Sequence, residues 1–446
     1  MSDTTQGASE TDLWIDPLTV VRSYVYTFVS EFGEEGPPSL PTVKTGNVGE
    51  TWNLTIPDPS AAQLSGRSIT KKRVYRTITS ASGVATYFFV AEVPLGTTAF
   101  ADTYDDDEIS ANEQLQSEGW SPPDSNFQGW VAMPNGIIAA WKDNEIWFSE
   151  PYRPHAWPAE YAVAVDYPVV GCGVVGQTLV ICTTGSPWTA TGVHPSVMSL
   201  AKINSYEPCT SRGSIISTPN GVIYSSPNGL VIAVPGQVSN LTSGLITPDK
   251  WQSKNQLGNL RAVQFNTAYM AYEAQTISTA KGLLIDPSPS YSRLGYVQLV
   301  DTSYITTNII PDPWSSLPLI IQGGKVYVLD QPNGANLRPY KWRSKIIKLN
   351  KKENLGAMKV YFTVPPGSPT LGTRVTNPTT LAENMYGIVR MYCDGVLRFS
   401  RELRVSGEEF RLPSGFLAEE WQFEIEARVN VNDIQIASTS RELARG

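Results

Sequence analysis

The tripeptide Pro-Asn-Gly occurs four times in the chain, at 134–136, 219–221, 227–229 and 332–334. Asn and Gly tolerate a positive φ angle, so each copy predicts a tight turn between two apolar strands. The first two copies begin 85 residues apart, which is close to two of the ~40–45-residue blades of a β-propeller. The pattern therefore predicts a propeller-like repeat of roughly five blades, and a large irregular sandwich is the alternative.

The rest of the chain also reads as strand and turn. The strongest helix signal is the capping-box sequence at 110–113, Ser-Ala-Asn-Glu, which predicts a turn or two of helix ending before Gly119. We expect an all-β protein with a propeller-like repeat domain, a fibronectin III-like sandwich and a small C-terminal β-sandwich. The expected segments are a flexible N-terminal arm (1–16), a fibronectin III-like β domain (17–108), a linker with a short helix (109–128), a β-propeller-like domain (129–340) and a C-terminal β domain (341–446).

The N-terminal β domain begins with a β-branched and aromatic run at 20–29. The run ends in a segment, 31–39, that is typical of the last hairpin of a fibronectin III module. This first hairpin lacks upstream strands of its own. It either completes the following sandwich in an unusual order or pairs with a neighbouring subunit. The strands expected in that sandwich are 52–56, 73–76, 87–90 and 98–100.

The C-terminal domain shows alternating apolar and polar residues, which is typical of strands with one buried face. Asp394-Gly395 predicts a two-residue hairpin turn. The strands expected around it are 358–364, 388–393, 396–400, 402–405 and 421–427.

Charge is scarce and uneven. Charged residues make up 17% of the chain, below the usual quarter, while Trp and Tyr number 12 and 20. Either partners cover part of the surface, or a large β protein simply uses few Lys and Glu. The net charge of −8 divides into −11 for residues 1–129, −1 for 130–340 and +4 for 341–446.

Targeting and redox signals are weak. No apolar run approaches ~18 residues, and the polar first ten residues lack the features of a signal peptide, so we expect neither a membrane span nor secretion. The four cysteines lack zinc-like spacing, and we expect buried thiols in a protein made in a reducing cytosol. They are Cys172, Cys182, Cys209 and Cys393.

The usual catalytic motifs are missing from the sequence. Only His155 and His194 are available for a Ser–His–Asp arrangement, each adjoins a proline, and there is no GxSxG or GK[ST] sequence. We expect no enzymatic activity, no cofactor and no metal. A pair of carboxylates distant in sequence, as in a glycosidase, is a weaker alternative that motif spacing does not test.

One dense acidic cluster spans 102–108. Its spacing partly matches a calcium loop, but the central Gly and the twelfth-position Glu are missing, so we predict a solvated acidic linker. The acidic residues are Asp102, Asp105, Asp106, Asp107 and Glu108.

Arg153, His155 and Trp157 are interface candidates because they lie in a segment, 151–158, that three prolines make rigid. A rigid loop loses little entropy on docking. The alternative is a connection between blades in which the histidine is satisfied locally.

Lys341, Arg343 and Lys345 are the second set of interface candidates, since alternate residues share one face of a strand. Such a stripe can be a solvated strand face or can bind phosphate. It can also dock on the acidic N-terminal domain of an adjacent subunit, which is the reading we prefer among the binding roles.

Several segments resemble a widespread family of bacteriophage virion proteins. They read FGEEGPPS at 32–39, NEIWFSEPYRPHAWP at 144–158, CTSRG at 209–213, YSSPNGL at 224–230, RLPSGF at 411–416 and ASTSREL at 437–443. Members in short-tailed phages include the tail nozzle, which continues the portal and adaptor. Long-tailed phages carry similar segments.

This resemblance implies a homo-oligomeric ring, a hexamer, in the virion tail, assembled from protein made in the bacterial host cytoplasm. Such a nozzle closes the portal and adaptor channel, retains packaged DNA and conducts it at ejection without binding it specifically. The implied partners are the head-to-tail adaptor and tail fibre or spike proteins. The alternative is a phage adhesin that recognises host surface sugar.

Overall fold

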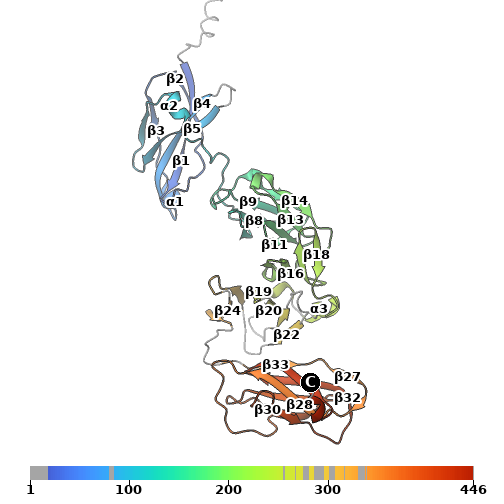
Figure 1. The fold of residues 1–446 in the computed structure, drawn as a ribbon. Coiled ribbons are helices and arrows are strands. Elements are labelled where there is room, and N and C mark those ends of the chain that lie inside the picture. The colour runs from blue at the N-terminus through green and yellow to red at the C-terminus, as the bar shows by residue number, and fades with distance from the viewer. Residues whose placement is uncertain are drawn as a thin grey trace, which may run out of the picture. The chain divides into compact units, whose positions relative to one another are not determined.

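The structure is a computed structural model in which the chain divides into two compact units, residues 1–327 and 328–446, each considered by itself (Figure 1). The expected N-terminal arm and the Pro-Asn-Gly copy at 332–334 lie outside the described residues. The structure describes residues 19–79, 85–254, 257–266, 268–274, 281–285, 296–300, 307–315, 317–329, 337 and 339–444.

The first unit begins with two packed antiparallel sheets. One has the strand order β2-β1-β4-β5, and the other pairs β3 with β6. Apolar side chains from both sheets, such as Tyr24, Trp52 and Val74, share one core. The elements are β1 (Thr19–Ser30), β2 (Thr42–Asn47), β3 (Trp52–Thr55), α1 (Ala61–Leu64), β4 (Ile69–Thr79), β5 (Ala85–Pro94), β6 (Ala99–Asp102) and α2 (Asp106–Ser110).

The first run of the sequence is therefore part of its own sandwich. β1 lies between β2 and β4, with Val25 opposite Tyr75 and Ser23 opposite Val43. Of the two arrangements left open by the sequence, the structure has the intrachain one.

Two sequence predictions near residue 105 are wrong. The helix α2 ends at Ser110, where the sequence predicted a helix to begin, and its capping box uses Asp105 and Glu108. The acidic cluster is not simply a solvated linker either. Asp102 is fully buried on Arg76 at 2.7 Å, and Asp106 bridges Arg76 and Arg22. These cations come from β1 and β4, so spacing within the cluster could not reveal them.

The Tyr24 hydroxyl donates to Asp102 at 2.8 Å, and burial together with this bond raises the pKa of Tyr24 to about 12. Since an unfolded tyrosine has a pKa of about 10, the neutral phenol stabilises the fold below about pH 10, and this contribution is lost as pH rises toward 12. We expect the wild type to lose about 1.4 kcal/mol more stability than Tyr24→Phe between about pH 8 and pH 11. Urea titrations at both pH values measure this difference, and equal losses would contradict it.

Five consecutive up-and-down antiparallel sheets follow within the described part of residues 129–328. Their first strands begin at 129, 169, 216, 260 and 308, which are intervals of 40, 47, 44 and 48 residues, close to the propeller-blade period. The first four sheets have four strands each, and the fifth has three.

The strands of the first sheet are β7 (Gly129–Ala132), β8 (Ile138–Lys142), β9 (Glu145–Phe148) and β10 (Val163–Ala164), and those of the second are β11 (Val169–Val175), β12 (Thr178–Thr183), β13 (Trp188–Thr191) and β14 (Ser199–Lys202). The third has β15 (Ile216–Thr218), β16 (Gly221–Ser226), β17 (Gly229–Val234) and β18 (Gln237–Asn240). The fourth has β19 (Leu260–Phe265), β20 (Ala268–Glu273), β21 (Lys281–Ile285) and β22 (Tyr296–Val300), and the fifth has β23 (Asn308–Pro311), β24 (Pro318–Gln322) and β25 (Lys325–Val328). Short helices between strands are η1 (Ala159–Tyr161), η2 (Pro195–Val197), η3 (Arg212–Ser214), α3 (Pro248–Lys254) and η4 (Leu257–Asn259).

The Pro-Asn-Gly turns within the described residues are confirmed. The copy at 134–136 joins β7 to β8, the copy at 219–221 joins β15 to β16, and the copy at 227–229 joins β16 to β17. Their glycines all have positive φ, from 78° to 150°. The first two copies thus occupy the same place in the first and third sheets, which explains their separation by about two blades.

Successive sheets pack face to face. In β12, Leu179 and Ile181 enter the core shared with the first sheet, whereas Val180 and Cys182 enter the core shared with the third. A further core joins the third and fourth sheets. A strand with both faces buried reads as a continuous apolar run, and stacked four-stranded antiparallel sheets are the building units of propellers. The coarse prediction of a propeller-like, all-β repeat is confirmed.

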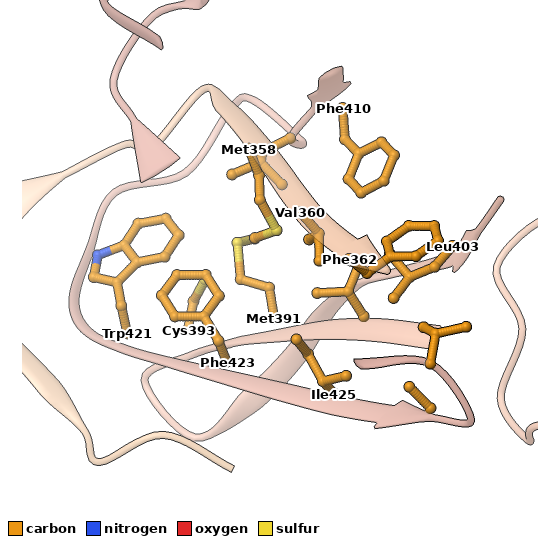
Figure 2. Close-up of a cluster of buried hydrophobic side chains, with 14 of the residues drawn as sticks. Met358, Val360, Phe362, Met391, Cys393, Leu403, Phe410, Trp421, Phe423 and Ile425 are labelled. Atoms are coloured by element: carbon orange, nitrogen blue, oxygen red, sulfur yellow. The ribbon is translucent and has the colours of Figure 1, made fainter. Parts of the chain in front are cut away.

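The second unit is a pair of sheets around one core (Figure 2). One sheet has the order β26-β32-β29-β30, with β27 also on β32, and the other has the order β31-β28-β33. Trp421 from the first sheet and Met358 from the second are both fully buried. The elements are β26 (Tyr340–Arg343), β27 (Ile347–Glu353), β28 (Ala357–Thr363), β29 (Gly387–Cys393), β30 (Val396–Leu403), β31 (Glu409–Arg411), β32 (Ala418–Ala427), β33 (Asn430–Ala437) and α4 (Ser440–Leu443).

The Asp394-Gly395 hairpin is confirmed, since both residues have positive φ and join β29 to β30. The two separate strands predicted at 396–400 and 402–405 are wrong, because β30 runs unbroken from Val396 to Leu403. All four cysteines are free thiols, of which Cys172 is half-buried and the others are buried. Across the residues that the structure describes, no helix has the length and apolarity needed to cross a membrane.

Candidate functional site: a polar cleft in the first unit

The segment 151–158, which we call the proline loop, connects β9 to η1 and lies against the N-terminal sheets. His155 Nε2 lies 3.1 Å from the carbonyl oxygen of Glu35, in the turn after β1. Arg153 donates to the Gln116 side chain at 3.0 Å and stacks 4.8 Å from the Trp120 ring centre. The loop, for which the sequence left an interface and a connection between blades open, joins two β regions of the same unit.

Trp157 has a different role from its two neighbours. Its side chain is 3% exposed, its ring lies 5.0 Å from the Phe127 ring, and its Nε1 donates to the Pro154 carbonyl at 2.8 Å. The backbone N–H of Trp157 also donates to Ser121. Trp157 therefore anchors the base of the loop, while Arg153 and His155 reach toward the N-terminal sheets.

A cleft of about 290 Å³ opens where these elements meet. Its lining comes from the turn after β1, from β4, from residues 113–120 and from the proline loop. This volume is at the small end of the range for ligand cavities. The polar and aromatic residues of the lining include Phe32, Glu34, Glu35, Ser117, Tyr152 and His155.

A closed network of hydrogen bonds forms one wall of the cleft. Glu35 accepts from Thr27 at 2.6 Å and from Tyr75 at 2.7 Å, and it pairs with Arg73 at 3.2 Å. Arg73 also pairs with Glu113. Burial, followed by the bond to Glu35, raises the pKa of Tyr75 and keeps it a neutral donor. These groups satisfy one another, so they fix the wall and are not free to bind a ligand.

Two buried polar atoms of the lining have no partner among the described residues. They are Ser117 Oγ and His155 Nδ1, and Ser117 as a whole is 1% exposed. The nearest charged group to His155 Nδ1 is Glu34, whose Oε1 lies 4.0 Å away. Buried polar groups normally have partners, so these two atoms set the cleft apart from the satisfied network on its other wall.

Sequence reasoning identifies Arg153 and His155 but misses Glu34 and Ser117 as site residues. Glu34 lies in the FGEEGPPS segment, whose pattern indicates only the end of a hairpin. Ser117 carries no signal of its own. Only contacts between segments distant in the sequence, such as the contact of Glu35 with His155, bring these residues together.

Tyr152 stands at the rim of the cleft on a backbone with φ of +58°. Its ring packs on Gly136, where an added Cβ would lie 2.6 Å from the Tyr152 ring carbon. The backbone N–H of Tyr152 donates to the Gly136 carbonyl at 2.8 Å. The first Pro-Asn-Gly turn therefore supplies both a sheet connection and the platform that orients Tyr152.

We expect Gly136→Ala to destabilise the first unit by about 1–3 kcal/mol, because it combines a strained positive φ with a clash against Tyr152. Gly119→Ala is the matched control, since Gly119 has φ of +80° with open space around its missing Cβ. Thermal or urea unfolding of both variants measures the difference. If the two variants lose equal amounts of unfolding free energy, the contact between Gly136 and Tyr152 contributes nothing to stability.

The other interface candidates lie in the second unit. Lys341 and Arg343 both pair with Glu424, a buried carboxylate, at 3.1 and 3.7 Å. Lys345 lies outside the strand that holds the other two, because β26 ends at Arg343. The stripe is thus partly neutralised within its own chain.

His194 is built into a local turn. Its Nδ1 accepts from the Ser196 backbone at 3.3 Å and caps η2, and its Nε2 lies 3.5 Å from Glu150. The structure does not bring His194 together with His155 in the cleft, since His194 is not among the lining residues.

Comparisons with known proteins give little. No protein-family model matches the chain, and no curated protein matches it. Among solved structures, the chain is similar to the N-terminal domain of Nup159, with 9% identity, a TM-score of 0.28 and coverage of 68% of this chain and 81% of that one. It is also similar to PorZ of Porphyromonas gingivalis, a component of the type-IX secretion system, with 11% identity, a TM-score of 0.18 and coverage of 70% and 51%. At these values the similarities carry no conclusion about fold or function.

Proposed function

We propose that the chain is a structural subunit of a bacteriophage tail, and specifically a tail nozzle. In this proposal the N-terminal sheets are a fibronectin III-like sandwich and the five sheets belong to a closed propeller. Copies assemble into a hexameric ring that joins the head-to-tail adaptor, carries fibres or spikes and conducts DNA. The protein acts in the virion tail and is not an enzyme.

The observation that carries the proposal is that the segments resembling phage virion proteins lie together in pairs, either in direct contact or bonded to a common residue. The segments 32–39 and 144–158 touch through Glu35 and His155 at 3.1 Å. The segments 209–213 and 224–230 touch through Thr210 and Ser225 at 2.9 Å. The segments 411–416 and 437–443 both bond to the backbone of Gly356. The resemblance therefore lies in the contacts that hold β regions together, as suits a structural role.

The charge distribution supports a conduit. Residues 130–340 have a net charge of −1. Every Lys or Arg that neutralises a phosphate adds salt-dependent affinity, so a basic wall would retard DNA that must leave quickly. A nearly neutral wall avoids this.

The test is assembly of the purified full chain, alone and with the portal and adaptor complex. Mass photometry and electron microscopy should find a six-fold ring, and purified rings should shift duplex DNA only weakly at physiological salt. A chain that stays monomeric under both conditions would contradict the ring. Tight DNA binding that falls steeply with salt would contradict the neutral wall. Incubation with capsular polysaccharide, lipopolysaccharide and peptidoglycan should release no fragments.

One observation favours the second candidate, a receptor-binding tail protein. The polar cleft has unpartnered buried groups and exposed aromatic side chains at its rim, and a purely structural joint needs neither.

A further inference from the structure

We propose that the cleft between the N-terminal sheets and the proline loop binds a single uncharged, hydroxyl-rich saccharide unit, such as the end of a glycan chain. Binding at this cleft does not depend on a ring, because every residue that lines it belongs to one copy of the first unit.

The free groups of the cleft call for a ligand that donates hydrogen bonds. His155 Nε2 faces the Glu35 carbonyl, which can only accept, so this contact selects the tautomer with the proton on Nε2 and a lone pair on Nδ1. Glu34 Oε1, 4.0 Å from Nδ1, is a second acceptor. Hydroxyl groups of a ligand placed between Nδ1 and Oε1 can donate a hydrogen bond to each of these two acceptors.

Ser117 adds a hydroxyl group to the cleft that can donate a hydrogen bond, so the ligand can also accept one. Its hydroxyl is buried, unpartnered among the described residues and able to donate or to accept. A sugar hydroxyl has the same dual capacity, so one ring carrying several hydroxyls matches Ser117, Glu34 and His155 together. A ligand with acceptors alone would leave Glu34 and His155 unsatisfied.

The rim provides apolar faces. Phe32 and Tyr152 both line the cleft and are 77% and 79% exposed. Exposed aromatic rings beside polar groups suit the C–H face of a sugar, because one side of the ligand is apolar and its edge is polar. Tyr152 is held in place by Gly136, so little side-chain entropy is lost on binding.

Charge and size exclude other ligand classes. Three carboxylates, Glu34, Glu35 and Glu113, line the cleft against two cations, Arg73 and Arg153, and Glu34 lies within ion-pair distance of no Lys or Arg among the described residues. The excess of negative charge disfavours phosphate, sulfate and uronate groups. The small cleft volume suits one ring better than an extended peptide, which gains its affinity along a strand edge or groove.

The experiment is saturation-transfer NMR on the full chain with glucose, galactose, N-acetylglucosamine, rhamnose and glucuronic acid as probes. At least one uncharged sugar should bind, and glucuronic acid should bind more weakly. Tyr152→Ala, Glu34→Gln and Ser117→Ala should each weaken binding roughly tenfold, as expected for the loss of one stacking or hydrogen-bonding partner. Tyr152→Phe should retain binding.

Tyr206→Ala and Glu118→Gln are matched controls, since both residues are exposed and neither lines the cleft. Both should bind as the wild type does. Melting curves identify any cleft variant that is misfolded. If Tyr152→Ala or Ser117→Ala is misfolded, the comparison of sugar binding by Tyr152→Phe and Glu34→Gln still tests the cleft. The proposal is overturned if no sugar binds or if the cleft variants bind normally. Neither result alters the ring measurement, so the two proposals fail separately.

Discussion

Trp157→Ala should cost about 3–5 kcal/mol of folding free energy, the range for truncation of a large buried aromatic side chain. Trp157 is almost fully buried, packs on Phe127 and closes the proline loop through its bond to Pro154. Its loss leaves a cavity at the base of the loop and frees Arg153 and His155 from the N-terminal sheets. Urea unfolding measures this loss of folding free energy, which is read from a shift of the midpoint with an unchanged m-value.

Two variants make this test specific. Trp130→Ala, in β7, removes an indole that is 72% exposed and should change stability by less than about 0.5 kcal/mol. Trp157→Phe keeps most of the packing but removes the bond to Pro154, so it should cost about 1–2 kcal/mol beyond any small cavity. If Trp157→Ala melts like Trp130→Ala, the loop does not depend on this anchor.

The turns of this protein could be predicted from sequence because turn chemistry is local. The copies of Pro-Asn-Gly at 134–136, 219–221 and 227–229 need no distant partner to set a positive φ at glycine. The same applies to Asp394-Gly395. The spacing of such turns then predicts the blade period, and with it the face-to-face sheets.

The prediction of a helix at 110–113 is wrong because tertiary contacts override a capping signal. The structure has a capping box at 105–108 in place of the one expected at 110–113. The box at 105–108 forms, since Ile109 is then buried in the core and Asp106 reaches Arg22 and Arg76. Residues 113 and 115 bond to β5 instead, which prevents helix at 110–113.

The cleft could be predicted only in part. The proline loop was recognisable because closely spaced prolines and aromatic residues indicate a rigid segment. Its partners were not, because Glu34 and Ser117 are ordinary surface residue types in sequence. Ser117 becomes a site residue because it is buried with no partner for its hydroxyl among the described residues, and the exposed Glu34 becomes one because its carboxylate lies 4.0 Å from His155. Neither property exists before the fold brings the segments together.

The network that holds β1, β4 and α2 together should be as sensitive as the Trp157 anchor. Arg76 and Asp102 are both fully buried and 2.7 Å apart, and Asp102 also accepts from Tyr24. Asp102→Ala leaves the Arg76 charge without its buried partner, which typically costs about 3–5 kcal/mol. Hydrogen exchange of the β1 and β4 amides should locate the loss in the N-terminal sheets.

A double variant shows whether the stability loss of Asp102→Ala comes from the unpaired charge of Arg76. If the penalty comes from an uncompensated charge, Arg76→Met with Asp102→Leu should be much more stable than Asp102→Ala, because replacing both ions with apolar groups removes the desolvation cost of each. Asp107→Ala, on the exposed face of α2, should stay within about 0.5 kcal/mol of the wild type. A double variant as unstable as Asp102→Ala would instead show that the shape of the network, through Tyr24 and Asp106, matters more than its charge balance.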